Sequence, residues 1–173
     1  MEKPLHVSGT VAALPSYVPI PGLGLLPVNA YVVKSTAPVL IDTGLHADVN
    51  EFMAALRGVI DPSDLRWIWL THIEQDHVGS LRGVLDEAPR AKVVTSFLGL
   101  GKLGLFAPLP LERVHLLNPG QGLDAGDRTL FAVAPPAFDA PETMGVYDEK
   151  SRMFFSSDCF GAVLEKPMED AAA

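Results

Sequence analysis

The chain has 173 residues, of which 48% are hydrophobic, with 15 glycines, 15 prolines and a formal net charge of −8. This length and apolar fraction predict one domain with a buried core, covering residues 1–173. The acidic balance, with no run of basic residues, argues against a nucleic-acid-binding surface and against docking on an anionic membrane.

The first part of the chain predicts three strands and a helix. Residues 7–13 have the composition of a strand. Residues 16–26 are rich in proline and glycine and are interpreted as a loop. Two strands, 29–34 and 38–42, follow and are joined by a short turn. Residues 48–58 then carry apolar side chains at helical spacing, with an aspartate at the expected N-cap, so a helix is predicted there.

The rest of the chain alternates between short strands and helices. Strands are predicted at 65–70, 92–95, 114–117 and 129–134, and a hairpin at 145–147 and 152–156. Residues 78–86 are interpreted as a short helix. Leucines mixed with glycines over 96–110 fit either a loose helix or a flap over a cleft. Strands that alternate with helices, together with hairpins, indicate an α/β layered fold.

The compartment is inferred from cysteine usage and from hydropathy. The chain has a single cysteine, Cys159, which excludes a disulfide within the chain and favours the reducing cytoplasm. The first residues lack a basic region followed by an apolar run, so no signal peptide is expected. The apolar stretches are shorter than the roughly 20 residues that a membrane-spanning helix needs.

Four potential metal ligands lie within six residues, directly after the predicted strand 65–70. They are His72, Glu74, Asp76 and His77. A strand that ends in such a loop holds the start of the loop rigidly, while the loop lets alternate side chains turn toward one point. Imidazole and carboxylate groups together suit zinc, iron or manganese. The sequence therefore predicts a metal-binding loop here.

Two further acids, Asp139 and Asp158, follow apolar segments later in the chain. An acid at the tip of a strand, beside a chain reversal, is an exposed and directed oxygen donor. Taken alone, Asp158 fits a turn or a helix cap equally well, and Asp139 fits a turn residue better than a ligand. Both acids gain weight as candidate ligands from the pattern of the whole chain.

Together these segments resemble the metallo-β-lactamase superfamily. Asp42-Thr43-Gly44 is similar to its Asp-Thr-Gly turn, and Thr71 to His77 is similar to its metal loop. Hydrolases of the superfamily usually carry histidine at the position of Glu74. The pattern His-x-Glu-x-Asp-His instead resembles the flavodiiron proteins and their flavin-lacking relatives, the oxygen-binding di-iron proteins. The resemblance implies a metallo-β-lactamase-like αββα sandwich, with the C-terminal part short or missing.

Two later segments extend the resemblance to Gly161. Asp139-Ala140-Pro141-Glu142-Thr143-Met144 is similar to the family's His-Trp-Pro-Asp-Ser-Met. Ser156-Ser157-Asp158-Cys159-Phe160-Gly161 is similar to its Ser-Asn-Asp-Ala-Phe-Gly. The resemblance begins near Asn29, so it covers most of the chain.

The resemblance also implies a role for each residue of the metal loop. His72 and Glu74 would bind a first iron, Asp76 would bind a second, and Asp158 would bridge the two. His77 would be a ligand or a close neighbour of the second iron. A carboxylate at Glu74 adds negative charge, which favours the higher oxidation states of iron and fits a redox role better than hydrolysis.

The chain departs from the family's pattern at two positions. The family has histidine where Asp139 stands, although a carboxylate can also ligate iron, so Asp139 is kept as a candidate ligand. The family has a final histidine on a later strand, and this chain reaches Ala173 without one. Asp42 is expected behind the ligands, where it would orient their side chains. Two irons are implied, or one, with zinc or manganese as alternatives.

Three functions remain open on this reading. The first is a di-iron oxidoreductase or sensor that binds O2 or NO. The second is a metal-dependent hydrolase, in which a metal-bound water attacks an ester, thioester or phosphodiester. The third is a degenerate metal-binding module without catalysis, because four carboxylates around one centre repel one another strongly without a cation.

Partners follow from the same resemblance. No phosphate-binding glycine loop and no cysteine pair are present, so electrons for O2 or NO would come from a separate donor protein. A short second sheet would leave an exposed edge, which predicts pairing with another copy in a homodimer.

Overall fold

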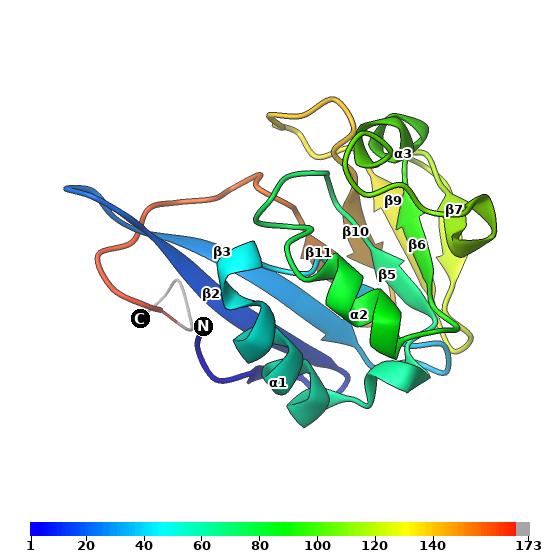
Figure 1. Cartoon of the computed structure of the whole chain (residues 1–173), viewed down its shortest axis with the longest axis horizontal. Coiled ribbons are helices and arrows are strands. Elements are labelled where there is room, and N and C mark those ends of the chain that lie inside the picture. The colour runs from blue at the N-terminus through cyan, green and yellow to red at the C-terminus, as the bar shows by residue number, and fades with distance from the viewer. Residues whose placement is uncertain (169–173) are drawn as a thin grey trace.

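Two β-sheets packed face to face form the frame of the protein. The computed structural model describes residues 1–168. The first sheet has the strand order β1-β2-β3-β4-β5-β6-β7, and the second has the order β11-β10-β9-β8 (Figure 1). Strands β1 to β4 pair antiparallel, whereas β4 to β7 pair parallel. The second sheet is antiparallel throughout.

The strands are mostly short, apart from the β2–β3 hairpin. The first sheet contains β1 (Leu5–Ser8), β2 (Val11–Ile20), β3 (Gly24–Val33), β4 (Val39–Ile41), β5 (Trp67–Trp69), β6 (Lys92–Thr95) and β7 (Val114–Leu116). The second sheet contains β8 (Gly122–Asp124), β9 (Thr129–Val133), β10 (Gly145–Asp148) and β11 (Met153–Phe155).

Three α-helices lie among the described residues, and all three contribute to the core on one side of the first sheet. They are α1 (Val49–Val59), α2 (Leu81–Glu87) and α3 (Phe97–Leu103). Short 3-10 turns lie at His46–Asp48, Pro62–Asp64 and Leu111–Arg113. Figure 1 shows α1 and α2 across the face of the first sheet that points away from the second sheet. None of the described segments is a helix long and apolar enough to cross a membrane.

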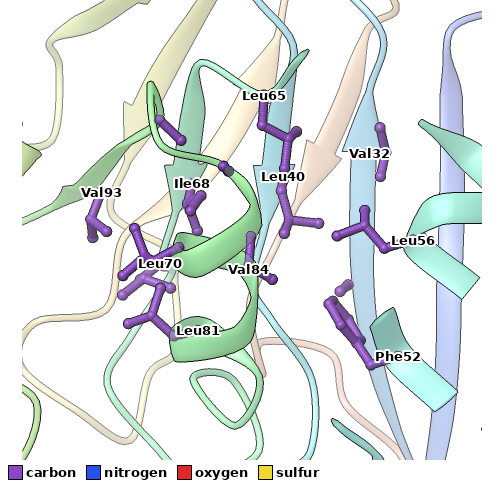
Figure 2. Close-up of a cluster of buried hydrophobic side chains, with 14 of the residues drawn as sticks. Val32, Leu40, Phe52, Leu56, Leu65, Ile68, Leu70, Leu81, Val84 and Val93 are labelled. Carbon is purple, nitrogen blue, oxygen red and sulfur yellow. The ribbon is translucent and has the colours of Figure 1, made fainter. Parts of the chain in front are cut away.

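The first sheet is buried on both faces, which explains why its central strands are continuous apolar runs. In β4, β5 and β6, alternate side chains point to opposite sides. One set, with Leu40, Ile68 and Val93, packs under the helices. Figure 2 shows these three side chains in one cluster with Val32 of β3, the helix residues Phe52, Leu56, Leu81 and Val84, and Leu65 and Leu70. The other set, with Ile41, Trp69 and Val94, packs against the second sheet, where Leu130 and Val146 meet it.

The α/β layered fold predicted from the sequence is confirmed. The layers run from helices to first sheet to second sheet, so residues 1–168 supply the α, β and β layers of the expected αββα order. The predicted helix at 48–58 is confirmed as α1, and the predicted hairpin at 145–156 is confirmed as β10 and β11. Within the ambiguous stretch 96–110, α3 begins after Ser96, whose hydroxyl caps the helix by accepting from the Gly99 N–H.

The predicted loop at 16–26 is wrong, because these residues complete a long hairpin of β2 and β3. Their register is continuous from Val11 opposite Val33 to Ile20 opposite Gly24. The prolines are tolerated because their positions face away from the partner strand. The Pro15 carbonyl accepts outward from the Glu2 N–H, and the Leu25 N–H donates outward to Leu164, so these positions need no N–H toward the hairpin partner.

Candidate metal centre

The candidate centre lies where the carboxyl ends of β4 and β5 in the first sheet meet the segment that follows β11 in the second sheet. Strands β4 and β5 are parallel neighbours, so their carboxyl ends lie at the same edge of the first sheet. Asp42 follows β4, and the loop that contains His72 and His77 follows β5. Thr43 donates from its N–H and its hydroxyl to the His77 carbonyl, which ties the two loops together. Asp158 arrives from the segment after β11.

His72 presents a buried nitrogen that is free for a ligand. The residue is 0% exposed, and its Nδ1 lies 3.0 Å from Ser157 Oγ and 3.4 Å from Thr71 Oγ1. The Thr71 hydroxyl donates to Asp42, so it can accept from a protonated Nδ1 of His72. Nε2 then carries the lone pair, and within residues 1–168 it has no hydrogen-bond partner. It faces Asp158 Oδ2 at 3.6 Å, too long for a hydrogen bond.

A lone pair and a carboxylate that face each other repel, and a cation or a proton between them removes the repulsion. A buried polar atom without a partner costs free energy and requires an explanation. Imidazole Nε2 and carboxylate oxygens are also the donors that zinc, iron and manganese share. The residues present therefore fit a bound metal ion.

His77 is held by Asp42 on one side and faces the same space on the other. Its Nδ1 lies 2.9 Å from Asp42 Oδ2, and because a carboxylate only accepts, Nδ1 carries the proton. Asp42 also accepts from the Thr71 N–H at 2.8 Å and from the Thr71 hydroxyl at 2.7 Å. His77 Nε2 lies 3.0 Å from Asp158 Oδ1 and 3.7 Å from Asp76 Oδ2. Asp42 thus lies where the sequence placed it, behind a candidate ligand.

The structure brings five of the six predicted ligands together. His72, His77 and Asp158 offer donor atoms that all lie within 4.8 Å of one another, and so do His72, Glu74 and Asp76. The two groups share His72, whose ring centroid lies 4.1 Å from that of His77.

The structure does not bring in Asp139, which is exposed and belongs to neither group. Its expected approach to the centre is not seen, because the chain turns just after it, where the Thr143 N–H donates to the Ala140 carbonyl. This turn directs Glu142, rather than Asp139, into the protein, and Glu142 is buried.

Comparison with known protein families shows which family the chain belongs to. The sequence profile described as "ODP family beta lactamase" matches residues 26–173. The chain belongs to the ODP family. Its relatives include an uncharacterized protein of Methanocaldococcus jannaschii, 32% identical over 133 residues that make up 77% of this chain and 34% of that protein. Another is the anaerobic nitric oxide reductase flavorubredoxin of Klebsiella pneumoniae, 31% identical over 77% of this chain and 28% of that protein.

Solved structures share the fold of this ODP family chain. The flavodiiron protein from Giardia intestinalis matches 96% of this chain and 43% of its own, with a TM-score of 0.83 and 18% identity. A mutant flavo di-iron protein from Thermotoga maritima matches 93% of this chain and 43% of its own, with a TM-score of 0.80 and 25% identity. The expected metallo-β-lactamase-like fold and flavodiiron relationship are therefore confirmed. The chain spans less than half the length of each of these four proteins.

The charges of the ODP family centre hold His77 in its protonated form. Burial alone lowers the pKa of His77, but the Asp42 and Asp158 carboxylates outweigh it and raise the pKa to about 11. The hydrogen bond from His77 in turn lowers the pKa of Asp158. A metal ion that binds Nε2 must displace this proton, so metal affinity should rise with pH.

The stability of the metal-free protein should fall as pH rises from about 6.5 toward about 11. Below the unfolded pKa of 6.5, His77 is protonated in both states and its ion pairs contribute fully. Above it, the unfolded chain loses the proton that the folded protein keeps, so this contribution declines until the folded group also titrates. The free energy of unfolding is measured by urea denaturation in the presence of a chelator, at several pH values, for wild type and for His77→Gln. Parallel pH dependences of the two proteins would contradict the expectation.

A cleft of about 1260 Å³ opens beside the candidate ligands. Asp76, His77 and Asp158 line one part of it. Side chains of the β2–β3 hairpin and of the segment after β11, including Tyr17 and Phe160, line the rest. The centre is thus reached from a space that is much larger than a diatomic molecule.

Sequence reasoning missed two residues that contact the candidate ligands, Ser157 and Lys102, and a third, Glu142, that pairs with Lys102. Ser157 contacts His72, and its backbone φ of 56° is uncommon for a residue other than glycine. Lys102 on α3 lies 3.7 Å from Glu74 Oε1 and 2.7 Å from Glu142 Oε1. The family's acid at the position of Glu142 was a signal for that residue, whereas a single lysine among leucines and glycines offered none.

Proposed function

We propose that this ODP family protein binds metal at this centre, as a non-haem iron protein of the flavodiiron type with one or two irons. It would bind or reduce O2 or NO with electrons from a separate donor. The observation that carries the proposal is the buried Nε2 of His72, which has no hydrogen-bond partner among the described residues 1–168 and faces Asp158 within 4.8 Å of a second imidazole. Zinc and manganese are the alternatives, since the donor set also suits them.

The residues of the chain would hold the metal and set the protonation of its ligands. With two ions, His72 and Glu74 would hold one and Asp76 and His77 the other, with Asp158 between them. Asp42 would keep the proton of His77 on Nδ1, so that Nε2 is the atom offered to the metal. Asp139 has no role in this arrangement, because it lies outside both groups.

Iron bound here would supply one-electron redox chemistry and a place for O2 or NO. Two features support this choice over other metals. Glu74 stands where hydrolases of the superfamily usually have histidine, and the added negative charge favours higher oxidation states. Relatives are named anaerobic nitric oxide reductase flavorubredoxin and rubredoxin oxygen:oxidoreductase. Because the chain spans less than half of these proteins, their activity is carried over as a proposal.

Anaerobic iron loading followed by an optical titration tests the proposal. Protein purified without oxygen is reconstituted with Fe(II), its iron content is measured, and O2 or NO is added in steps. We expect bound iron and a spectrum that changes with each addition. The proposal would be contradicted by protein that takes up no iron, or by iron-loaded protein whose spectrum does not change with O2 or NO. Protein that binds none of the metals tested would favour a degenerate module.

A metal-dependent hydrolase is the second candidate, and the size of the cleft favours it. About 1260 Å³ next to Asp76 and His77 exceeds what a diatomic gas needs and is above the range of many small-molecule sites. In that case Asp76 would hold or deprotonate the attacking water. Turnover of a thioester or phosphodiester by protein loaded with zinc or manganese would support this candidate over the first.

We also propose a cytoplasmic homodimer that receives electrons from another protein. Phe131, Tyr147 and Phe154 stand side by side across β9, β10 and β11. They face away from the first sheet, since their chain neighbours pack between the sheets. This aromatic row supports association with a second copy. Sedimentation that shows monomer alone at micromolar concentration would count against the dimer.

A further inference from the structure

Lys102 brings a positive charge to the side of the centre that Glu74 occupies. Its ammonium lies 3.7 Å from Glu74 Oε1 and 2.7 Å from Glu142 Oε1, so one lysine serves two carboxylates. The side chain of Glu74 is 43% exposed, whereas that of Glu142 is only 3% exposed. The lysine therefore connects the metal loop to a buried acid that is outside both groups of candidate ligands.

Glu142 fixes the lysine in this position. Its carboxylate is buried and accepts from the Ile73 N–H at 3.4 Å, with Lys102 as its cation. A buried carboxylate that loses its counter-ion is strongly destabilising. The helix that carries Lys102 is held as well, since Ser96 caps its first turn and also donates to the Glu142 carbonyl. Lys102 cannot swing away from Glu74 without leaving Glu142 unpaired.

A metal ion on Glu74 would then lie beside a fixed ammonium. Like charges within about 4–6 Å oppose each other, and a divalent ion would meet this repulsion in a partly buried site. Asp139, the further ligand that the resemblance offered, adds no donor at this position, because it is exposed and lies outside both groups. At the other position His77 Nε2, Asp76 and Asp158 face each other, and within residues 1–168 no lysine or arginine pairs with these two acids. The only cation among these groups is His77, whose proton a metal ion would displace from Nε2.

We infer that Lys102 takes the place of one metal ion, so that the centre holds a single ion bound by His72, Asp76, His77 and Asp158. This inference rests on the proposed function, because it concerns the metal content of the same centre. Glu74 is then an ion-pair partner of Lys102 instead of a ligand. Removal of the ammonium frees Glu74 and creates a second position.

Metal counting on Lys102 variants tests the inference. Lys102→Met is one variant, and Lys102→Met/Glu142→Gln is a second that leaves no buried charge unpaired and so protects the fold. Lys102→Arg keeps the charge, and Lys150→Met removes a lysine from an exposed ion pair with Asp127. Each protein is titrated with Mn(II) alone, bound metal is counted by elemental analysis, and electron paramagnetic resonance separates an isolated ion from a coupled pair.

We expect one ion per chain in wild type, Lys102→Arg and Lys150→Met, and two in the variants without the ammonium. The affinity for the second ion should rise by roughly tenfold or more. Glu74→Gln added to the double variant should return the count to one. Two ions in wild type, or one ion in both Lys102→Met variants, would overturn the inference and leave the proposed function standing. A wild type that binds no metal would overturn the proposed function and this inference with it.

Discussion

Asp158→Asn is expected to abolish stabilisation of the protein by metal, whereas Asp139→Asn should leave it intact. Asp158 contacts His77 Nε2 at 3.0 Å and faces His72 Nε2 at 3.6 Å, so it completes the group that carries the proposed ion. A ligand at 100 times its Kd stabilises the folded state by about 2.7 kcal/mol. For a chain of this length that corresponds to a rise in Tm of roughly 5–10 °C.

The measurement is the difference in Tm with and without Fe(II), Mn(II) or Zn(II) for each protein separately. This difference removes the change in metal-free stability that Asp158→Asn causes by taking a partner from His77. Asp139→Asn is the matched control, since it makes the same chemical change at an exposed position that the sequence also nominated. A metal-induced shift that survives in Asp158→Asn, or disappears in Asp139→Asn, would place the ion elsewhere.

Arg128→Met is expected to destabilise the protein by about 3–5 kcal/mol, because it leaves a buried carboxylate without its counter-ion. Arg128 and Asp148 are 1% and 0% exposed as side chains, and their closest atoms are 2.9 Å apart. Arg128 also donates to Thr10 Oγ1 at 3.2 Å. The pair thus joins the second sheet to the turn between β1 and β2, and its loss should loosen the packing of the two sheets.

The midpoint of urea unfolding measures this effect in the metal-free protein. Arg128→Met/Asp148→Leu replaces both charges by apolar groups and should recover much of the loss, because no charge is left buried alone. Lys150→Met disrupts a neighbouring but exposed ion pair and should cost at most about 1 kcal/mol. Equal losses in all three variants would show that the burial of the pair is not the cause.

The parts of the centre that could be predicted from the sequence are those whose geometry is local. His72, Glu74, Asp76 and His77 lie on one loop within six residues, so their closeness in space follows from their closeness in sequence. Asp158 lies far along the chain and was found through the family's motif. That motif also nominated Asp139, which stays a prediction: it is exposed, and the acid buried at the turn after residue 140 is Glu142.

The parts that could not be predicted depend on contacts between distant segments. The ion pair between Lys102 and Glu74 forms because α3 lies next to the metal loop. No local sequence pattern predicts this contact between distant segments. The prolines and glycines of residues 16–26 predicted a loop instead of the β2–β3 hairpin. Composition does not show whether a proline nitrogen faces the partner strand, where an N–H is needed, or faces away from it. The core helices and strands were predictable, since their apolar periodicity is a direct consequence of burial on one or both faces.

Anomalous diffraction at the iron edge tests the central claim most directly, because it gives the identity, number and place of the metal together. The crystals would contain protein loaded with Fe(II) in the absence of oxygen. The account predicts one anomalous peak per chain, within coordination distance of His72, His77 and Asp158. Fully loaded crystals without a peak at this point, or with the peak at another part of the surface, would contradict it.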